Sequence, residues 1–138
     1  MKILIVDDQV VTLKKMKKIL EIFGDCELAE DGPEAIQLFK QSLENKVPFD
    51  LVMLDIEMPG IDGTEVLFEL REIEKEFKVP KHELARILMV TSHSDKDTVI
   101  TSVQAGCNDY VVKPINKETI VEKLGKLGFC PIQTEQSE

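Results

Sequence analysis

The chain is organised around residues 49–60, which read Phe49-Asp50-Leu51-Val52-Met53-Leu54-Asp55-Ile56-Glu57-Met58-Pro59-Gly60. An apolar run of strand length places the carboxylate of Asp55 at its C-terminal end, and Pro59 with Gly60 interrupts the chain before a helix can begin. This pattern is typical of a buried parallel strand. Ligands of open α/β sheets bind beyond the carboxyl ends of the strands, so the position of Asp55 favours a chemical role over a structural one.

Four further segments have the composition of strands, and amphipathic helices are predicted between them. The strands are residues 2–6, 26–30, 86–92 and 109–113. The helices are expected from Val10 to Gly24, from Gly32 to Leu43, from an Asp62 cap to near Pro80, from a Ser94 or Asp95 cap to Ala105, and from an Asn116 cap to Leu127. Strands and helices alternate five times, which predicts one α/β domain with a parallel sheet and helices on both faces.

The fourth expected helix has an unfavourable composition for a helix. It contains the β-branched residues Val99, Ile100, Thr101 and Val103, which lose side-chain freedom in a helix and lower its intrinsic stability. We therefore expect packing to hold this helix, and we expect it to be the element that shifts or frays.

Length, charge and cysteine content restrict the class of protein. The 138 residues suffice for one domain, and 26 acidic against 17 basic residues give a net charge of -9. Such a surface repels phosphate backbones, so we expect no direct nucleic-acid binding by this chain. With no apolar run of membrane length, no export leader, and three widely spaced cysteines that we interpret as reduced thiols, we expect a soluble, cytoplasmic protein without membrane contact. The lysines of the first helix, Lys14, Lys15, Lys17 and Lys18, favour a solvated face over a docking surface for an acidic partner.

The ends of the predicted strands carry residues that could form one site. Asp7 and Asp8 end the first strand, Asp55 the third, Thr91 the fourth and Lys113 the fifth. In a doubly wound sheet these ends converge. Crowded carboxylates raise one another's pKa unless a cation lies among them, and Mg²⁺ is a cation that prefers oxygen ligands. Together with a hydroxyl and an ammonium group, the set predicts a pocket for an anion and favours a phosphoryl group.

The sequence resembles the receiver domains of two-component response regulators from Met1 to about Leu127. The matching motifs are Asp7-Asp8, the segment Leu54-Asp55-Ile56-Glu57-Met58-Pro59-Gly60, Thr91, Tyr110, Lys113-Pro114, and the turn positions Asp62-Gly63 and Ala105-Gly106. The resemblance implies a flavodoxin-like (βα)5 fold with the strand order 2-1-3-4-5 that is typical of this family. It implies a receiver domain over residues 1–128, followed by a polar tail over 129–138 that we expect to be disordered.

The same resemblance implies a role for each site residue. Asp55 is the phosphoacceptor, Thr91 and Lys113 hold the phosphoryl oxygens, and the Lys113–Pro114 bond is usually cis. The implied ligands of Mg²⁺ are Asp7, Asp8, Asp55 and the backbone carbonyl of Glu57, with Asp8 favoured over Asp7 as a direct ligand.

The implied function is a phosphorylation switch and not an enzyme with an external substrate. A sensor histidine kinase or a histidine phosphotransfer protein supplies the phosphoryl group, and slow self-catalysed hydrolysis removes it. Thr91 moves toward the phosphate, Tyr110 fills the vacated space, and the surface of the fourth helix, fifth strand and fifth helix changes for a downstream target. The sequence leaves open the kinase, the target, homodimerisation on phosphorylation, and whether the chain stands alone or forms part of a longer regulator.

Two positions at the rim of the site depart from a common form of the family. Glu57 follows Asp55 by two residues and adds a fourth negative charge, and His93 follows Thr91 by two residues. Our hypothesis is that Glu57 and His93 set the dephosphorylation rate by shaping the path of the attacking water. Two exposed polar side chains are an equally favoured interpretation. His82 is interpreted as a loop residue.

Other interpretations of the constellation stay open. The acids could be helix caps and Lys113 a solvated side chain, although capping does not explain why they all follow strands. Phosphohydrolases with an aspartate nucleophile also place an Asp after an apolar strand, but a second Asp normally follows two residues later, where this chain has Glu57. A nucleotide- or flavin-binding protein would need a phosphate-binding loop that the first strand lacks. An interaction module could keep the fold without phosphorylation.

Overall fold

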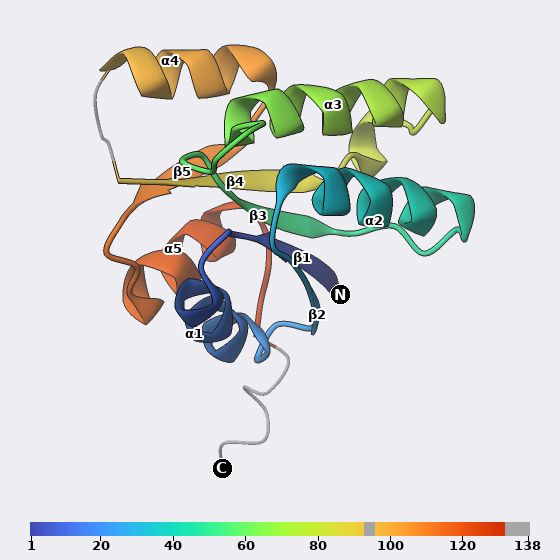
Figure 1. Ribbon diagram of the computed structural model, residues 1–138. Coiled ribbons are helices and arrows are strands. Elements are labelled where there is room, and N and C mark those ends of the chain that lie inside the picture. The colour runs from blue at the N-terminus through green and yellow to red at the C-terminus, as the bar shows by residue number, and fades with distance from the viewer. Residues whose placement is uncertain (93–95, 132–138) are drawn as a thin grey trace.

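The computed structural model describes residues 1–92 and 96–131 of the chain (Figure 1). Its elements in order are β1 (Lys2–Val6), α1 (Val10–Leu20), β2 (Asp25–Ala29), α2 (Gly32–Glu44), β3 (Leu51–Asp55), α3 (Gly63–Glu76), the 3-10 turn η1 (Lys81–Glu83), β4 (Arg86–Thr91), α4 (Lys96–Ala105), β5 (Asp109–Val112) and α5 (Lys117–Lys126). The predicted alternation of strands and helices is confirmed.

The strands form one parallel sheet in the order β2-β1-β3-β4-β5. This order, implied by the family resemblance, is confirmed, and β2 is an edge strand as its weak apolar pattern predicts. Figure 1 shows α2, α3 and α4 on one side of the sheet and α1 and α5 on the other. The order reverses between β1 and β3, so the crevice for ligands of such sheets lies beyond the ends of these two strands.

Side-chain alternation along the strands builds two cores, one on each face of the sheet. Ile3 and Ile5 of β1 pack with the apolar residues of α1 and α5. Leu4 and Val6 pack on the opposite face, against α2 and α3. All five residues of β3 are buried, because strands covered by helices on both faces have no solvent side. The rigid position of Asp55 at the end of β3 follows from this burial.

Among the described residues, side-chain hydrogen bonds cap the N-termini of three helices, α2, α3 and α5. Asp62 accepts hydrogen bonds from the backbone N–H groups of Thr64 (2.9 Å) and Glu65 (3.1 Å), and the Glu65 carboxylate accepts from the Asp62 N–H in return. The predicted capping box is therefore confirmed. Asp31 caps α2 and accepts from the Glu34 N–H. Asn116 caps α5 as predicted and accepts from the Thr119 N–H. The predicted Ser94 or Asp95 cap of α4 lies outside the described residues.

Element boundaries differ from the predicted ones by a few residues. The first helix ends at Leu20, not near Gly24, because the chain turns there and the Phe23 N–H donates to the Leu20 carbonyl. Phe23 nevertheless remains buried in the core that the apolar pattern predicts. The polar connection after α3 contains η1, and it reverses direction at Lys78, which has a positive φ of 56°.

Gly63 brings the start of α3 against the end of β3. A Cβ atom at this position would lie 2.2 Å from the backbone oxygen of Asp55 and 2.7 Å from the Cα of Ile56. The Gly63 N–H also donates to the Ile56 carbonyl at 3.0 Å. Only glycine permits this approach, so Gly63 fixes the loop that carries Glu57.

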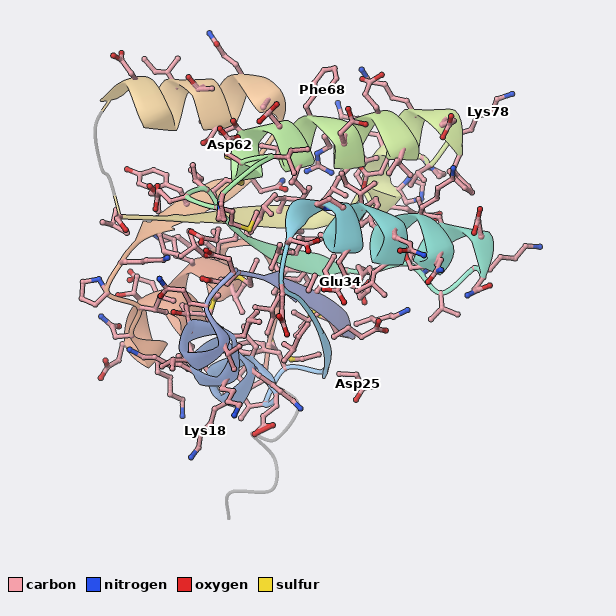
Figure 2. The ribbon with its side chains drawn as sticks, in the orientation of Figure 1. Lys18, Asp25, Glu34, Asp62, Phe68 and Lys78 are labelled. Atoms are coloured by element: carbon pink, nitrogen blue, oxygen red, sulfur yellow. The ribbon has the colours of Figure 1, made fainter. Side chains whose placement is uncertain are left out.

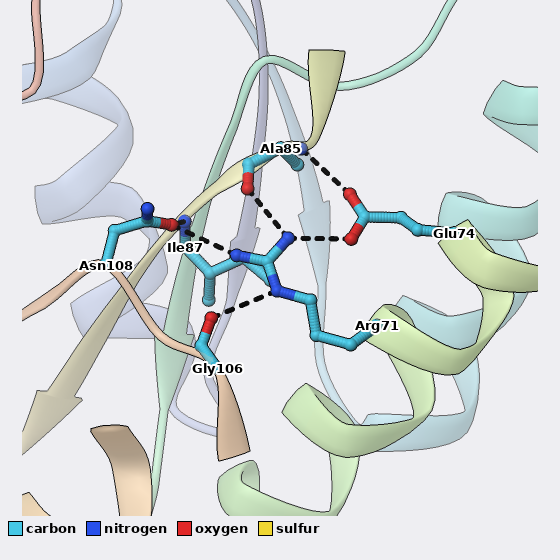
Figure 3. Close-up of polar contacts among 6 residues, drawn as sticks. All are labelled: Arg71, Glu74, Ala85, Ile87, Gly106 and Asn108. Atoms are coloured by element: carbon cyan, nitrogen blue, oxygen red, sulfur yellow. Dashed lines mark hydrogen bonds and ion pairs between the residues drawn. The ribbon is translucent and has the colours of Figure 1, made fainter. Parts of the chain in front are cut away.

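A buried ion pair ties α3 to the start of β4 and to the segment that follows α4. Glu74 is 2% exposed and accepts from Arg71 Nη1 at 2.7 Å and from the Ala85 N–H at 2.8 Å. Arg71 also donates to the carbonyls of Ala85 (2.9 Å) and Gly106 (3.0 Å) and to the side-chain oxygen of Asn108 (3.0 Å) (Figure 3). This network holds the C-terminal end of α4, which the sequence predicts to be weakly helical on its own.

The surface agrees with the amphipathic patterns. Lys14, Lys15, Lys17 and Lys18 of α1 are all exposed, and Figure 2 shows Lys18 directed away from the sheet. Phe68 extends outward from α3 in the same view and is 55% exposed. Among the described residues we find no helix with the length and apolar character that crossing a bilayer requires.

Candidate functional site

Hydrogen bonds between neighbouring strand ends bring the predicted polar residues to one edge of the sheet. Asp55 pairs with Val90, so the chain after β4 begins beside Asp55. Thr91 pairs with Val112, and the Lys113 N–H donates to the Thr91 carbonyl at 2.7 Å. The ends of β3, β4 and β5 therefore deliver a carboxylate, a hydroxyl and an ammonium group to the same place.

Three carboxylates meet at this edge. Carboxylate oxygens of Asp7, Asp8 and Asp55 all lie within 4.8 Å of one another. Asp7 is 0% exposed and Asp55 is 1% exposed, whereas Asp8 lies at the surface. Asp7 Oδ1 accepts from the Gln9 N–H at 2.9 Å. The Oδ2 atoms of Asp7 and Asp55 are buried without a hydrogen-bond donor among the described residues, and such oxygens are costly unless a cation or donor approaches them.

Lys113 partly neutralises the two buried acids. Its Nζ atom lies 3.2 Å from Asp55 Oδ1 and 3.7 Å from Asp7 Oδ2. The Lys113–Pro114 peptide bond is cis, as the family resemblance implies. One ammonium group faces two acids here, so negative charge remains in excess.

The excess charge and the burial appear in the pKa values of the site. Burial, together with the negative charge of Asp7, raises the pKa of Asp55 to about 6, although Lys113 opposes the shift. Burial also raises the pKa of Asp7. For Lys113, burial alone would lower the pKa, but Asp55 and Asp7 outweigh it and raise the pKa. These directions describe a site that favours an additional cation.

The donor set fits Mg²⁺. It consists of carboxylate oxygens only, it has buried oxygens without donors among the described residues, and one of its members, Asp8, is exposed to solvent. Mg²⁺ is bound in proteins through a few carboxylate or carbonyl oxygens and keeps several of its waters.

Glu57 binds the end of β4. Its Oε2 atom accepts from the Thr91 hydroxyl at 2.5 Å, and its Oε1 atom accepts from the Ser92 N–H at 2.8 Å. The Glu57 N–H lies 3.3 Å from Asp55 Oδ1. The side chain is half-buried, so the interpretation of Glu57 as an exposed polar residue is wrong. His93, the other predicted rim residue, lies outside the described residues.

Tyr110 lies on the edge strand β5, which β4 separates from β3 and Asp55. It pairs with Met89 in the sheet and packs, partly buried, against the core shared with α2 and α3. The Lys123 ammonium lies 5.2 Å from the centroid of its ring, and Lys123 also pairs with Asp109 at 3.1 Å. The Tyr110 ring therefore contacts Lys123 of α5 and also packs against the apolar core.

Sequence reasoning did not identify two features of this site. One is the Ser92 N–H, which donates to the Glu57 carboxylate. A backbone donor leaves no trace in the amino-acid sequence, and the only available clue was that Ser92 follows Thr91. The other is the direction of the Glu57 side chain toward Thr91 and Ser92, which come from a different strand. Neither pattern is visible in local periodicity.

Comparison with protein families identifies one family over most of the chain. Residues 3–125 match the family model for the response regulator receiver domain. Among curated proteins, the chain is 36% identical over 129 residues to chemotaxis protein CheY-3 of Vibrio cholerae. The alignment covers 92% of this chain and 91% of the relative.

Solved structures with the same fold include two complexes with Mg²⁺ and BeF3. The CheX-CheY-BeF3-Mg complex from Borrelia burgdorferi contains a chain that is 29% identical, with a TM-score of 0.76 over 91% of this chain and 87% of that one. The receiver domain of the histidine kinase CKI1 from Arabidopsis thaliana, complexed with Mg²⁺ and BeF3⁻, is 27% identical, with a TM-score of 0.75 over 91% and 89% of the two chains.

Proposed function

Because this chain belongs to the response regulator receiver domain family, whose members act as phosphorylation-dependent signalling switches, we propose that Asp55 is its phosphoacceptor. One observation carries the proposal. The buried Asp55 carboxylate lies at the end of β3 with Lys113 Nζ 3.2 Å away and with carboxylate oxygens of Asp7 and Asp8 within 4.8 Å. No simpler structural role accounts for three acids and one ammonium group at the switch point of the sheet.

The proposed reaction transfers a phosphoryl group from phosphohistidine to Asp55. A carboxylate oxygen of Asp55 attacks phosphorus in line with the P–N bond. That bond breaks, and its electron pair stays on the imidazole nitrogen, which can take a proton from water. Lys113 holds the acceptor carboxylate before the transfer and a phosphoryl oxygen after it, so no new cation has to be positioned during the step.

We propose that Asp7, Asp8, Asp55 and the backbone carbonyl of Glu57 hold Mg²⁺, with Asp8 as the exposed member of the set. Bound there, the ion would neutralise the phosphoryl oxygens and the acids at the same time. The buried Oδ2 atoms of Asp7 and Asp55 support this assignment, because the described residues provide them with no donor.

The proposed output of the switch passes through Thr91 and Tyr110. Thr91 is buried and ends β4, so its hydroxyl can turn toward a phosphoryl group on Asp55. Tyr110 lies on the neighbouring strand with its ring partly buried. A change in its packing alters the surface of α4, β5 and α5. Exposed Val103 of α4 and Val112 of β5 give this surface apolar contact area.

Receiver domains interact with histidine kinases and phosphotransfer proteins, and we propose one of these as the phosphodonor. A relative of this chain occurs within hybrid signal transduction histidine kinase L of Dictyostelium discoideum, where the match covers 7% of that protein. A downstream protein target and homodimerisation on phosphorylation belong to the same proposal. So does a cytoplasmic location, which agrees with three free cysteines.

The proposal is tested by intact mass after incubation with Mg²⁺ and phosphoramidate, beside an Asp55→Asn variant. We expect one acid- and hydroxylamine-labile phosphate on the wild type and none on the variant. Continuous release of inorganic phosphate without a labelled protein would instead favour a phosphohydrolase. If the protein is not labelled and no phosphate is released, the result would favour a fold that serves only for binding.

A further inference from the structure

The donors at the end of β4 are already occupied by an anion of the protein itself. The Glu57 carboxylate accepts from the Thr91 hydroxyl at 2.5 Å and from the Ser92 N–H at 2.8 Å. Both oxygens of one carboxylate are thus engaged by two adjacent residues. A carboxylate held in this way resembles, in charge and spacing, two oxygens of a phosphoryl group.

These donors lie beside the acceptor aspartate. The Ile56 N–H donates to the Val90 carbonyl at 2.9 Å, which ties the chain after Asp55 to β4 at the residue before Thr91. The Glu57 N–H lies 3.3 Å from Asp55 Oδ1. The negative charge of Glu57 also contributes to the raised pKa of Asp55, after burial and Asp7. A phosphoryl group on Asp55 would therefore arrive next to the Glu57 carboxylate.

We propose that Glu57 is an internal competitor of the phosphoryl group: its carboxylate holds the Thr91 hydroxyl and the Ser92 N–H in the unphosphorylated protein and is displaced when Asp55 is phosphorylated. This inference rests on the proposed function of Asp55. Two anions cannot share the same two donors without strong repulsion. Displacing Glu57 costs free energy, and this cost lowers the stability of the phosphorylated state. Glu57 therefore lowers the affinity of the site for a phosphoryl group.

The inference differs from a role for Glu57 in guiding water. A residue that guides water changes the rate at which the phosphoryl group is lost. A competitor lowers the equilibrium affinity of the site for a phosphoryl-like anion. It also occupies the Ser92 N–H when no ligand is bound.

The test uses the full chain, saturating Mg²⁺ and beryllofluoride, which imitates a phosphoryl group on a carboxylate. Dissociation constants are measured by calorimetry for the wild type, Glu57→Ala, Glu57→Asp and the control Glu69→Ala. Glu69 is an exposed acid of α3 whose removal changes the net charge equally without touching the β4 donors. Glu57→Asp keeps the charge, but its shorter side chain cannot reach both donors.

We expect Glu57→Ala and Glu57→Asp to bind beryllofluoride about tenfold more tightly than the wild type, since a charge-assisted hydrogen bond no longer has to be broken. Glu69→Ala should match the wild type. In the free protein, hydrogen exchange of the Ser92 amide should be faster in Glu57→Ala than in the wild type. With beryllofluoride bound, the two proteins should protect this amide equally.

Three results would overturn the inference. Unchanged or weaker binding by Glu57→Ala would exclude competition while leaving the proposed function intact. Tighter binding by Glu57→Ala with wild-type binding by Glu57→Asp would assign the effect to charge alone. Failure of the wild type to bind beryllofluoride, together with failure of Asp55 to accept phosphate, would remove the proposed function and this inference with it.

Discussion

Lys113 and Asp55 form an ion pair of 3.2 Å that bridges the ends of β5 and β3 across β4. The two residues come from strands that are not neighbours in the sheet, so the pair depends on the register of both flanking strands on β4. Lys113 is the partner of Asp7 as well, at 3.7 Å. A single ammonium group therefore restrains two buried acids, and the chemistry of the site depends on it more than on any other cation among the described residues.

Replacing Lys113 by Ala should slow phosphorylation of Asp55 by about 100-fold at saturating Mg²⁺. The expected loss corresponds to the removal of one preorganised group that stabilises charge on transferring oxygens. The measurement is the rate of phosphoprotein formation from phosphoramidate. Lys126→Ala, which removes an exposed lysine of α5, is the control, and a similar rate in Lys113→Ala and Lys126→Ala would contradict the role of Lys113.

Stability should decrease as the pH rises through the range in which Asp55 ionises. Its pKa is about 6 in the folded protein and has an ordinary value of 3.8, so between these values the folded state binds more protons than the unfolded state. Linkage then requires the free energy of unfolding to fall as pH increases from about 4 to above 6. The raised pKa of Asp7 acts in the same direction.

Replacing Asp55 by Asn isolates this contribution. Without Mg²⁺ at pH 7, Asp55→Asn should increase the free energy of unfolding by on the order of 2–3 kcal/mol, because the variant avoids an ionised buried carboxylate. Urea unfolding at pH 4.5 and 7 measures the difference. A gain of equal size at both pH values would show that the raised pKa of Asp55 is not its cause.

Mg²⁺ should stabilise the wild type and reverse the pH trend. Binding to the folded state alone adds about 2.7 kcal/mol at a concentration of 100 times the dissociation constant, and binding should release protons because the ligands must be ionised. Thermal unfolding with increasing Mg²⁺ measures the effect. Asp8→Ala, which removes the exposed member of the acidic set, should lose most of the shift, and an equal shift in this variant would place the ion elsewhere.

The sequence predicted the parts of this molecule that depend on local pattern. The apolar run ending at Asp55 predicted the buried strand, and the Asp62 and Glu65 pair predicted the α3 cap. Contacts set by three-dimensional approach escaped prediction. The Glu57 side chain contacts residues 34 and 35 positions away in the chain, and the Arg71 network joins segments up to 37 residues apart. Periodicity carries no information about such contacts.

Glu74 gives the last prediction, because its carboxylate is 2% exposed and satisfies both Arg71 Nη1 and the Ala85 N–H. Glu74→Ala should lower the free energy of unfolding by about 3 kcal/mol, since it leaves a largely buried guanidinium and a buried N–H without their acceptor. Glu72 pairs with Lys75 on the same helix at the same spacing but in solvent, so Glu72→Ala should cost less than about 0.5 kcal/mol. Urea unfolding compares the two variants, and equal losses would show that burial does not strengthen the Arg71 network.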